Sequence, residues 1–159
     1  MAMTMRTVGL DEVMSTLARL NADAEKVAAE SLYKGAGIIA DAFANAARSI
    51  RTEQFTHKKA KRLPSPEEKA AIIGKTGIAR FDKNGSEVNT LIGVSGAAGY
   101  ANIGGKQKAV RLIARAINSG TSFMPKQPVF RKAKSASQGP AKAAIIGKAE
   151  EMLNEITKG

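Results

Sequence analysis

The clearest helix signal in the chain is DAEKVAAESLYKGAGIIADAFANAARSI, which runs from Asp23 to Ile50. Small and large apolar residues recur in it at steps of three and four, the spacing of one helix face. The residues of that face are Ala28, Leu32, Gly35, Ile39, Phe43, Ala46 and Ile50. The pattern predicts a helix over residues 23–50, about 42 Å long at 1.5 Å per residue. Because Gly35 and Gly37 lower helix propensity, we expect a close neighbour to pack there.

Other segments carry weaker helix signals. Leucines and other apolar residues at steps of three and four predict a short amphipathic helix over Asp11–Leu20. Ser65-Pro66-Glu67-Glu68 is typical of a helix start, and the glycines at 74 and 77 predict that this helix is short. The residues Val110, Ile113, Ala114 and Ile117 predict a helix over Lys106–Asn118 that Gly120 ends. A last helix is predicted from Ile145, Ala149, Met152, Leu153 and Ile156.

A β-hairpin is predicted where Gly77–Phe81 and Val88–Val94 flank the segment Asp82–Ser86. Asn84-Gly85 between two runs with β propensity is a strong hairpin signal. The glycine-rich residues 96–105 and the residues 135–140 are predicted to be loops.

The charge is large and unevenly distributed. The chain of 159 residues, long enough for one domain over residues 1–159, has 25 Lys and Arg, 14 Asp and Glu, and a net charge of +11. Val88–Ala149 contains no acid and ten cations. A second basic segment, Arg51–Leu63, is predicted to be an exposed, mobile loop. Such charge favours a polyanion or an acidic protein partner, although a merely solvated basic surface remains an alternative.

The composition and spacing argue against an enzyme. The chain has no Cys, and His57, its only histidine, lies in the Lys-rich loop without acids at ligand spacing, so we expect no metal site. Gly74-Lys75-Thr76 lacks the earlier glycine of a phosphate-binding loop, and no cofactor is predicted. The uncharged residues 88–105 hold five glycines and predict strand and loop, with no membrane contact. Few aromatic residues interleave the cations, which leaves only non-specific nucleic-acid attraction open.

Two motifs carry a resemblance to a known family. They are Gly9-Leu10-Asp11-Glu12 and Gly120-Thr121-Ser122-x-Met124-Pro125-x-Gln127-Pro128-x-x-Arg131. With the order of elements between them, the chain resembles the gene-product-ten-like morphogenesis proteins of lambda-like long-tailed phages, the neck, tail-completion or minor tail proteins, which are similar to tail terminators. Asn118 and Ser119 stand where that pattern has an acid and an aromatic residue.

The resemblance implies an α+β fold: a small antiparallel β-sheet packed by a long N-terminal helix and a C-terminal helix. It implies a structural virion protein, assembled in the host bacterial cytoplasm into a ring, six-fold in symmetry, that closes the tail tube and joins it to the head connector. Other neck, connector and tail-tube proteins would be its partners. The alternative function is non-specific DNA binding through the basic surface.

Two groups of residues are the predicted sites. The interaction and assembly residues are Phe123, Met124, Pro125, Gln127, Pro128, Phe130 and Arg131. The basic surface residues are Lys106, Lys108, Arg111, Arg115, Lys58, Lys59, Lys61 and Arg62. We expect Phe123, Met124, Val129 and Phe130 to anchor the two prolines to the fold; alternatively, Phe123 and Met124 face a neighbour in the ring. Part of the acid-free stretch is predicted to line a channel for phage DNA or to face an acidic partner.

Overall fold

The structure, a computed structural model, describes residues 2–5, 24–52, 62–84, 87–94 and 99–158. Its elements are β1 (Ala2–Met5), α2 (Ala24–Arg48), α3 (Pro66–Lys75), β2 (Thr76–Ile78), β3 (Asp82–Asn84), β4 (Glu87–Val94), β5 (Tyr100–Ile103), β6 (Lys106–Ala109), α4 (Val110–Ser119) and α5 (Val129–Lys158). This confirms the predicted α+β class, with the long N-terminal and C-terminal helices packed on antiparallel strands. The predicted helix at Asp11–Leu20 and most of the predicted basic loop lie outside the described residues.

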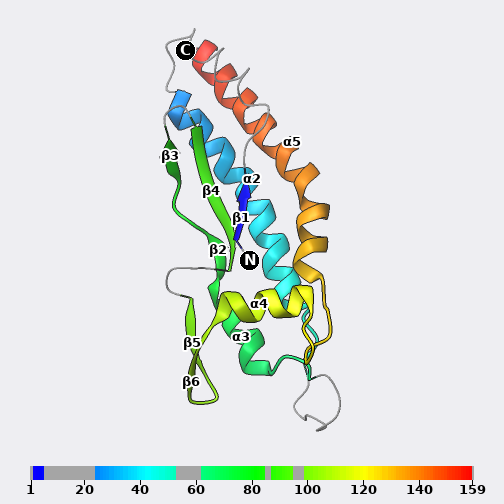
Figure 1. Ribbon diagram of the computed structural model, residues 1–159. Helices are drawn as coiled ribbons and strands as arrows, with labels where there is room; N and C mark the ends of the chain where they lie inside the picture. The colour runs from blue at the N-terminus through cyan, green and yellow to red at the C-terminus, as the bar shows by residue number, and fades with distance from the viewer. Residues whose placement is uncertain (1, 6–23, 53–61, 85–86, 95–98, 159) are drawn as a thin grey trace.

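Helices α2 and α5 are the longest elements and run antiparallel along the length of the molecule (Figure 1). All residues of the predicted face are buried, and so are Val27, Ser31, Ala36 and Ala47 beside it. The predicted helix is confirmed, although α2 ends at Arg48 and Ile50 lies just beyond it. The core also includes Ile72 from α3, Ile92 from β4 and Phe130 from α5. The buried face of α2 therefore packs against both the sheet and α5.

Helix α5 corrects one sequence prediction. Residues 135–140 were expected to form a loop, but α5 continues through them with Pro140 inside the helix. Proline inside a helix costs about 3 kcal/mol because a backbone donor is lost and its ring crowds the preceding turn. Pro140 itself is exposed, and its neighbours Ser137 and Ala141 are buried. Packing against α2 offsets the local preference for a loop, which the local sequence could not reveal.

The predicted close neighbour of Gly35 is α5. A Cβ atom at Gly35 would lie 2.9 Å from the Ala141 carbonyl oxygen and closer still to the Ile145 side chain. A Cβ atom built at Gly37, two residues further along α2, would have no neighbouring atom within 4 Å. The two glycines of one helix therefore have different roles: only Gly35 is required for close packing of α2 on α5.

Replacing Gly35 by alanine is expected to destabilise the protein by about 1–3 kcal/mol, because the backbone oxygen of Ala141 cannot move aside cheaply. Gly37→Ala is the matched control. It should stabilise the protein by about 0.5–1 kcal/mol, since alanine has the higher helix propensity and meets no neighbour. Urea unfolding of both variants tests this pair; equal effects of the same sign would contradict the close approach at Gly35.

The main sheet is centred on β4. Strand β1 pairs antiparallel with one edge of β4, while β2 and β3 pair with the other edge. Between the β2 and β3 ladders, residues 79–81 lie opposite residues 90–91, so the edge carries one extra residue, as in a β-bulge. Thr90 Oγ1 donates a hydrogen bond of 2.9 Å to the Ala79 carbonyl at this point. The predicted hairpin is confirmed, with pairing that extends to Asn84 and Glu87.

A second hairpin, β5–β6, was not predicted. Gly104 and Gly105 connect its strands with φ values of +59° and +74°, the backbone geometry of a type I′ turn. The expected helix over Lys106–Asn118 is thus wrong in its first turn: Lys106–Ala109 is a strand, and α4 begins at Val110. The Gly-Gly turn outweighs the helical pattern because it brings Lys106–Ala109 beside Tyr100–Ile103. Gly120, with φ of +76°, ends α4 as predicted.

Candidate interaction surface at the basic end

The start of α3 positions the most buried acid of this region. The Ser65 hydroxyl accepts a hydrogen bond of 3.1 Å from the Glu68 backbone N–H. The Glu68 carboxylate in turn accepts one of 3.0 Å from the Ser65 backbone N–H. This capping box, with Pro66 following Ser65, confirms the helix start predicted from the sequence. It also fixes the Glu68 side chain beside the chain segment that precedes the helix.

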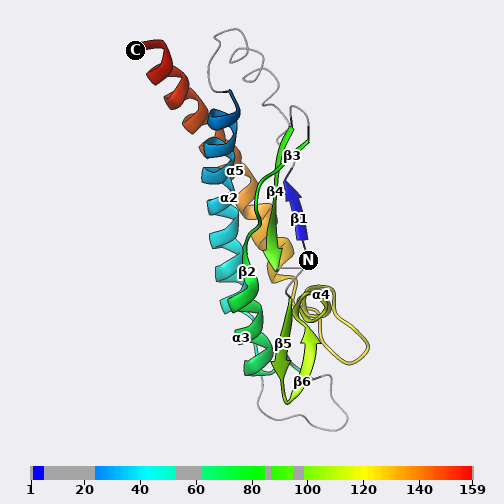
Figure 2. The same cartoon turned by 90° about the vertical axis from the view of Figure 1, so that its left-hand side faces the viewer.

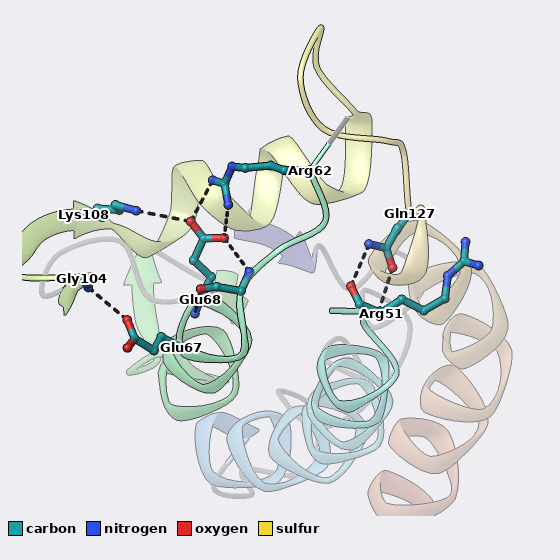
Figure 3. Close-up of polar contacts among 8 residues, drawn as sticks. Arg51, Arg62, Glu67, Glu68, Gly104, Lys108 and Gln127 are labelled. Atoms are coloured by element: carbon teal, nitrogen blue, oxygen red, sulfur yellow. Dashed lines mark hydrogen bonds and ion pairs between the residues drawn. The ribbon is translucent and has the colours of Figure 1, made fainter. Parts of the chain in front are cut away.

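Glu68 accepts hydrogen bonds from two cations that belong to distant parts of the chain (Figure 3). Arg62 contributes two of them, each 2.9 Å long, one to each carboxylate oxygen. Lys108 Nζ of β6 lies 3.4 Å from Glu68 Oε1. The Glu68 side chain is only 1% exposed, whereas Arg62 and Lys108 are 36% and 40% exposed. One buried carboxylate therefore joins residue 62, α3 and the second hairpin.

These contacts set the charge states of the pair. Burial by itself raises the pKa of the Glu68 carboxyl, but the hydrogen bonds from Arg62 and Ser65, with the positive charges of Arg62 and Lys108, outweigh it. The pKa of Glu68 is therefore lowered below its ordinary value. The hydrogen bond to Glu68 raises the pKa of Arg62, so both groups are charged at neutral pH.

The neighbouring acid, Glu67, holds the tip of the hairpin. Its carboxylate accepts a hydrogen bond of 3.0 Å from the Gly104 backbone N–H (Figure 3). Ile103 is buried, so the inner side of β5 contributes to the packing near α3. An isolated two-stranded hairpin is only marginally stable in water. Glu67 and Glu68 supply the polar contacts that fix β5–β6 on the body of the fold.

The structure gathers the net positive charge of the described residues at one end of the molecule, which we call the basic end and define as residues 48–52, 62–75 and 99–134. It comprises α3, α4, β5, β6 and the adjoining ends of α2 and α5 (Figures 1 and 2). Its thirteen cations are Arg48, Arg51, Arg62, Lys69, Lys75, Lys106, Lys108, Arg111, Arg115, Lys126, Arg131, Lys132 and Lys134. Glu67 and Glu68 are its only acids. The remaining described residues hold seven cations and eight acids, so their charge is nearly balanced.

The predicted basic surface residues divide into three groups. Lys106, Arg111 and Arg115 are exposed, and within the described part of the chain no ion pair involves them. Lys108 and Arg62 are partly exposed, but both are ion-paired with Glu68. Residues Lys58, Lys59 and Lys61 lie outside the described residues. The sequence analysis could not reveal these ion pairs. Glu68 lies outside both the acid-free stretch that contains Lys108 and the basic segment that contains Arg62.

Helix α4 presents its cations to solvent as the sequence predicted. Val110, Ala114 and Ile117 are fully buried, whereas Arg111 and Arg115 lie one turn apart on the exposed side. Leu112 is also on the surface, with 57% of its area exposed.

The predicted assembly motif divides between the core and the surface. Met124, Gln127 and Phe130 are buried within the chain, so their side chains serve the fold and are not available to a partner in this structure. Pro125, Pro128 and Val129 are partly buried, while Phe123 and Arg131 are exposed. Of the four predicted anchors, Met124 and Phe130 are buried in the core and Val129 packs against it, whereas Phe123 is exposed.

Gln127 is the residue whose role the sequence did not reveal. Its side-chain oxygen accepts a hydrogen bond of 2.9 Å from the Arg51 backbone N–H, and its side-chain nitrogen donates one of 3.2 Å to the Arg51 carbonyl (Figure 3). Its own backbone N–H donates to the Ile117 carbonyl at 2.8 Å. Gln127 therefore joins the ends of α2 and α4 to the start of α5. Nothing in the sequence pairs residue 51 with residue 127.

Large apolar side chains accompany the cations of the basic end. Tyr100, Leu112 and Phe123 are each 57–63% exposed. Scattered apolar residues are normal on protein surfaces, but aromatic residues together with arginine are enriched where macromolecules bind. The basic end is therefore the best candidate for an interaction surface in the described part of the chain.

The described residues contain no group of three or more His, Cys, Asp and Glu side chains able to hold a metal ion. None of the helices in that same part of the chain is long and apolar enough to span a membrane. Comparison of the whole chain with protein-family models, with curated proteins and with solved structures finds no match.

Proposed function

We propose that this protein is a structural component of a phage virion that assembles with copies of itself at the head–tail junction, as a neck, tail-completion or tail-terminator protein. In this proposal it is not an enzyme: it works by forming a ring that closes the tail tube and joins it to the head connector. The phage role derives from the resemblance of the Gly9–Glu12 and Gly120–Arg131 motifs. The observation that supports an assembly role is the basic end.

The basic end combines two features that suit binding to another macromolecule. Thirteen cations and two acids produce a field that is not cancelled locally, so attraction to a polyanion or an acidic protein follows from electrostatics. The exposed Tyr100, Leu112 and Phe123 add apolar area that a purely solvated charged surface does not need. In a ring, this end would face either the DNA in the central channel or an acidic partner on the head or tail side.

The second candidate function is non-specific DNA binding by a protein that forms no ring. The concentration of charge at one end favours it, because phosphate contacts by Lys and Arg supply most of the affinity of such proteins. Measurement of particle size separates the two candidates. A defined ring that persists from low to high salt supports the virion role, whereas a monomer or dimer with strongly salt-dependent DNA affinity supports the second function.

The contribution of the unpaired cations can be measured directly. Replacing Lys106, Arg111 and Arg115 together by glutamine should weaken binding to duplex DNA and lower the slope of log affinity against log salt by up to about 3. The protein should remain folded, since all three side chains are exposed. The matched control replaces Lys26, Lys34 and Lys142, three exposed lysines outside the basic end, and should leave the slope nearly unchanged.

The same variants test the phage role in a joining assay with purified heads and tails. Failed joining with intact rings and unchanged DNA affinity would identify an acidic protein as the partner of the basic end. Normal joining, normal DNA retention and unchanged DNA affinity at every ionic strength would show that these cations only keep the protein soluble, and the proposal for the basic end would fall.

A further inference from the structure

An apolar groove lies between the second half of α2 and the first half of α5, beside the basic end. Its volume is about 390 Å³. Its apolar lining comes from Ile38, Ala42 and Ala46 of α2 with Val129, Ala133 and Ala136 of α5. Most of these side chains are alanines, so the groove has room for a larger apolar side chain from outside the molecule.

One cation of each helix stands at the edge of this groove. Lys132 of α5 contributes to the lining and is exposed. Arg48 of α2 is exposed and donates a hydrogen bond of 2.9 Å to the side-chain oxygen of Asn45, another lining residue. Asp41, an exposed acid of α2, lies about 10 Å from Arg48 along the helix, toward the other end of the groove. The half of the groove nearest the basic end therefore suits a partner that offers an apolar side chain flanked by acids.

The opposite end of the molecule carries the complementary charge. We call it the acidic end and define it as residues 24–30 at the start of α2 and residues 148–156 near the end of α5, which lie together in Figures 1 and 2. Its acids are Glu25, Glu30, Glu150, Glu151 and Glu155, and its cations are Lys26 and Lys148. Electrostatic attraction therefore favours contact of the acidic end of one copy with the basic end of another.

Two acids of this end stand beside an exposed apolar residue. Ile156 of α5 is 41% exposed, and Glu151 and Glu155 are exposed on the last turns of the same helix. Glu151 lies 3.0 Å from Lys148 Nζ, and the hydrogen bond between them, with the charges of Glu155 and Glu30, raises the pKa of Lys148. One lysine thus interacts with three acids, whose combined charge remains negative.

The groove and the acidic end of one molecule cannot meet each other. Ala136 lines the groove and Ile156 belongs to the acidic end, and both lie on the continuous helix α5. The helix between these two residues extends over about 30 Å. Only the acidic end of another molecule can therefore enter the groove.

We propose that the groove between α2 and α5 binds the acidic end of a second copy of this chain, with Ile156 in the groove and Glu151 and Glu155 beside Arg48 and Lys132. This inference rests on the proposed assembly of copies and names the contact that joins them. The two surfaces are different parts of one chain, so the contact is heterologous. Repetition of a heterologous contact around a closing rotation generates a ring.

Engineered disulfides test this contact without background from native thiols, because the chain has no cysteine. The full-length variant Ile156→Cys with Ala136→Cys, oxidised at the concentration at which particles form, should give covalent dimers and longer species on non-reducing electrophoresis. Ile156→Cys with Ala143→Cys is the matched control, since Ala143 is exposed on α5 outside the groove. Its yield of covalent oligomers should be about tenfold lower, because a disulfide requires Cα atoms within about 7 Å of each other.

Two charge-reversed variants test the heterologous arrangement. One changes the acidic end, Glu151→Lys with Glu155→Lys, and the other changes the groove, Arg48→Glu with Lys132→Glu. Each variant alone should assemble about tenfold more weakly, since like charges then face each other. In an equimolar mixture each altered surface meets its complement on the other variant, so assembly should return.

Analytical ultracentrifugation of each variant and of the mixture measures this effect. All four altered side chains are exposed, so circular dichroism of the variants should match that of the unmodified protein. Weakened assembly that does not return in the mixture would contradict the pairing of the acidic end with the groove.

The outcomes separate this inference from the proposed function. Rings seen by electron microscopy without the disulfide between residues 136 and 156 would overturn the contact and leave the virion role standing. Covalent species that stop at dimers would overturn the heterologous arrangement. Covalent oligomers of a protein whose loss leaves the joining of heads to tails intact would uphold the contact and reject the virion role. A protein that stays monomeric at every concentration would contradict both.

Discussion

Phe130→Ala is expected to lower the free energy of unfolding by about 3–5 kcal/mol, the usual cost of deleting a large buried aromatic side chain. Phe130 is 1% exposed, and its ring centroid lies 5.5 Å from that of Phe43 on α2. The variant loses this ring contact and leaves a cavity where α5 begins. Urea or thermal unfolding measures the loss.

Phe123→Ala is the control for that variant. Because Phe123 is 60% exposed, its loss should change the free energy of unfolding by no more than about 0.5 kcal/mol. If Phe123 faces a neighbour in the ring, particle sizing should show defective assembly of a fully stable protein. A large loss of stability in both variants, or in neither, would contradict the division of the motif between core and surface.

Glu68→Gln is expected to destabilise the protein at neutral pH by about 2–3 kcal/mol. Removing one partner of a buried ion pair usually costs about 3–5 kcal/mol, and we reduce that figure because Arg62 and Lys108 are more than a third exposed and retain water. The amide cannot accept both hydrogen bonds from Arg62. The contacts of α3 with Arg62 and with Lys108 of the β5–β6 hairpin therefore weaken. Glu150→Gln, at an exposed acid of α5, is the control and should cost little.

The pH dependence of this effect has a definite sign. The folded-state pKa of Glu68 is lowered from the ordinary value of 4.5, chiefly by Arg62 against the cost of burial. Its contribution to stability is complete above pH 4.5 and is lost as the pH falls through the folded-state pKa. The difference in unfolding free energy between the unmodified protein and Glu68→Gln should therefore narrow on acidification. A difference that stays constant from pH 7 to below that pKa would show that the ionised carboxylate is not what stabilises the fold.

Much of the framework follows from local sequence signals. The face from Ala28 to Ile50 predicted α2, Ser65 to Glu68 predicted the start of α3, and Asn84-Gly85 predicted the hairpin. Each of these signals acts through neighbours in the sequence: helix periodicity, a capping side chain and a turn that glycine permits. Such interactions need no knowledge of what lies across the fold.

The errors occurred where a distant partner changed a local preference. Residues 135–140 are helical because α5 packs along α2, and Lys106–Ala109 pairs with β5 across two glycines in place of forming a helical turn. Lys108 and Arg62 looked unpaired because the acid that binds them belongs to neither segment. Gln127 was predicted to be an assembly residue, and in the structure its buried side chain binds the backbone of residue 51, which is 76 positions away in the sequence.

Local sequence signals were enough to predict the α2 helix, the helix start at Ser65, the first hairpin and the excess of positive charge, because these depend on composition or on residues within a few positions of each other; the α+β class was predicted from the family resemblance. The tertiary structure was needed to learn which cations are ion-paired, which motif residues are buried, and that the positive charge of the described residues gathers at one end. The physical reason is that burial and ion pairing depend on distances between residues remote in sequence. Those distances are set when α5 and the hairpin pack on the rest of the chain.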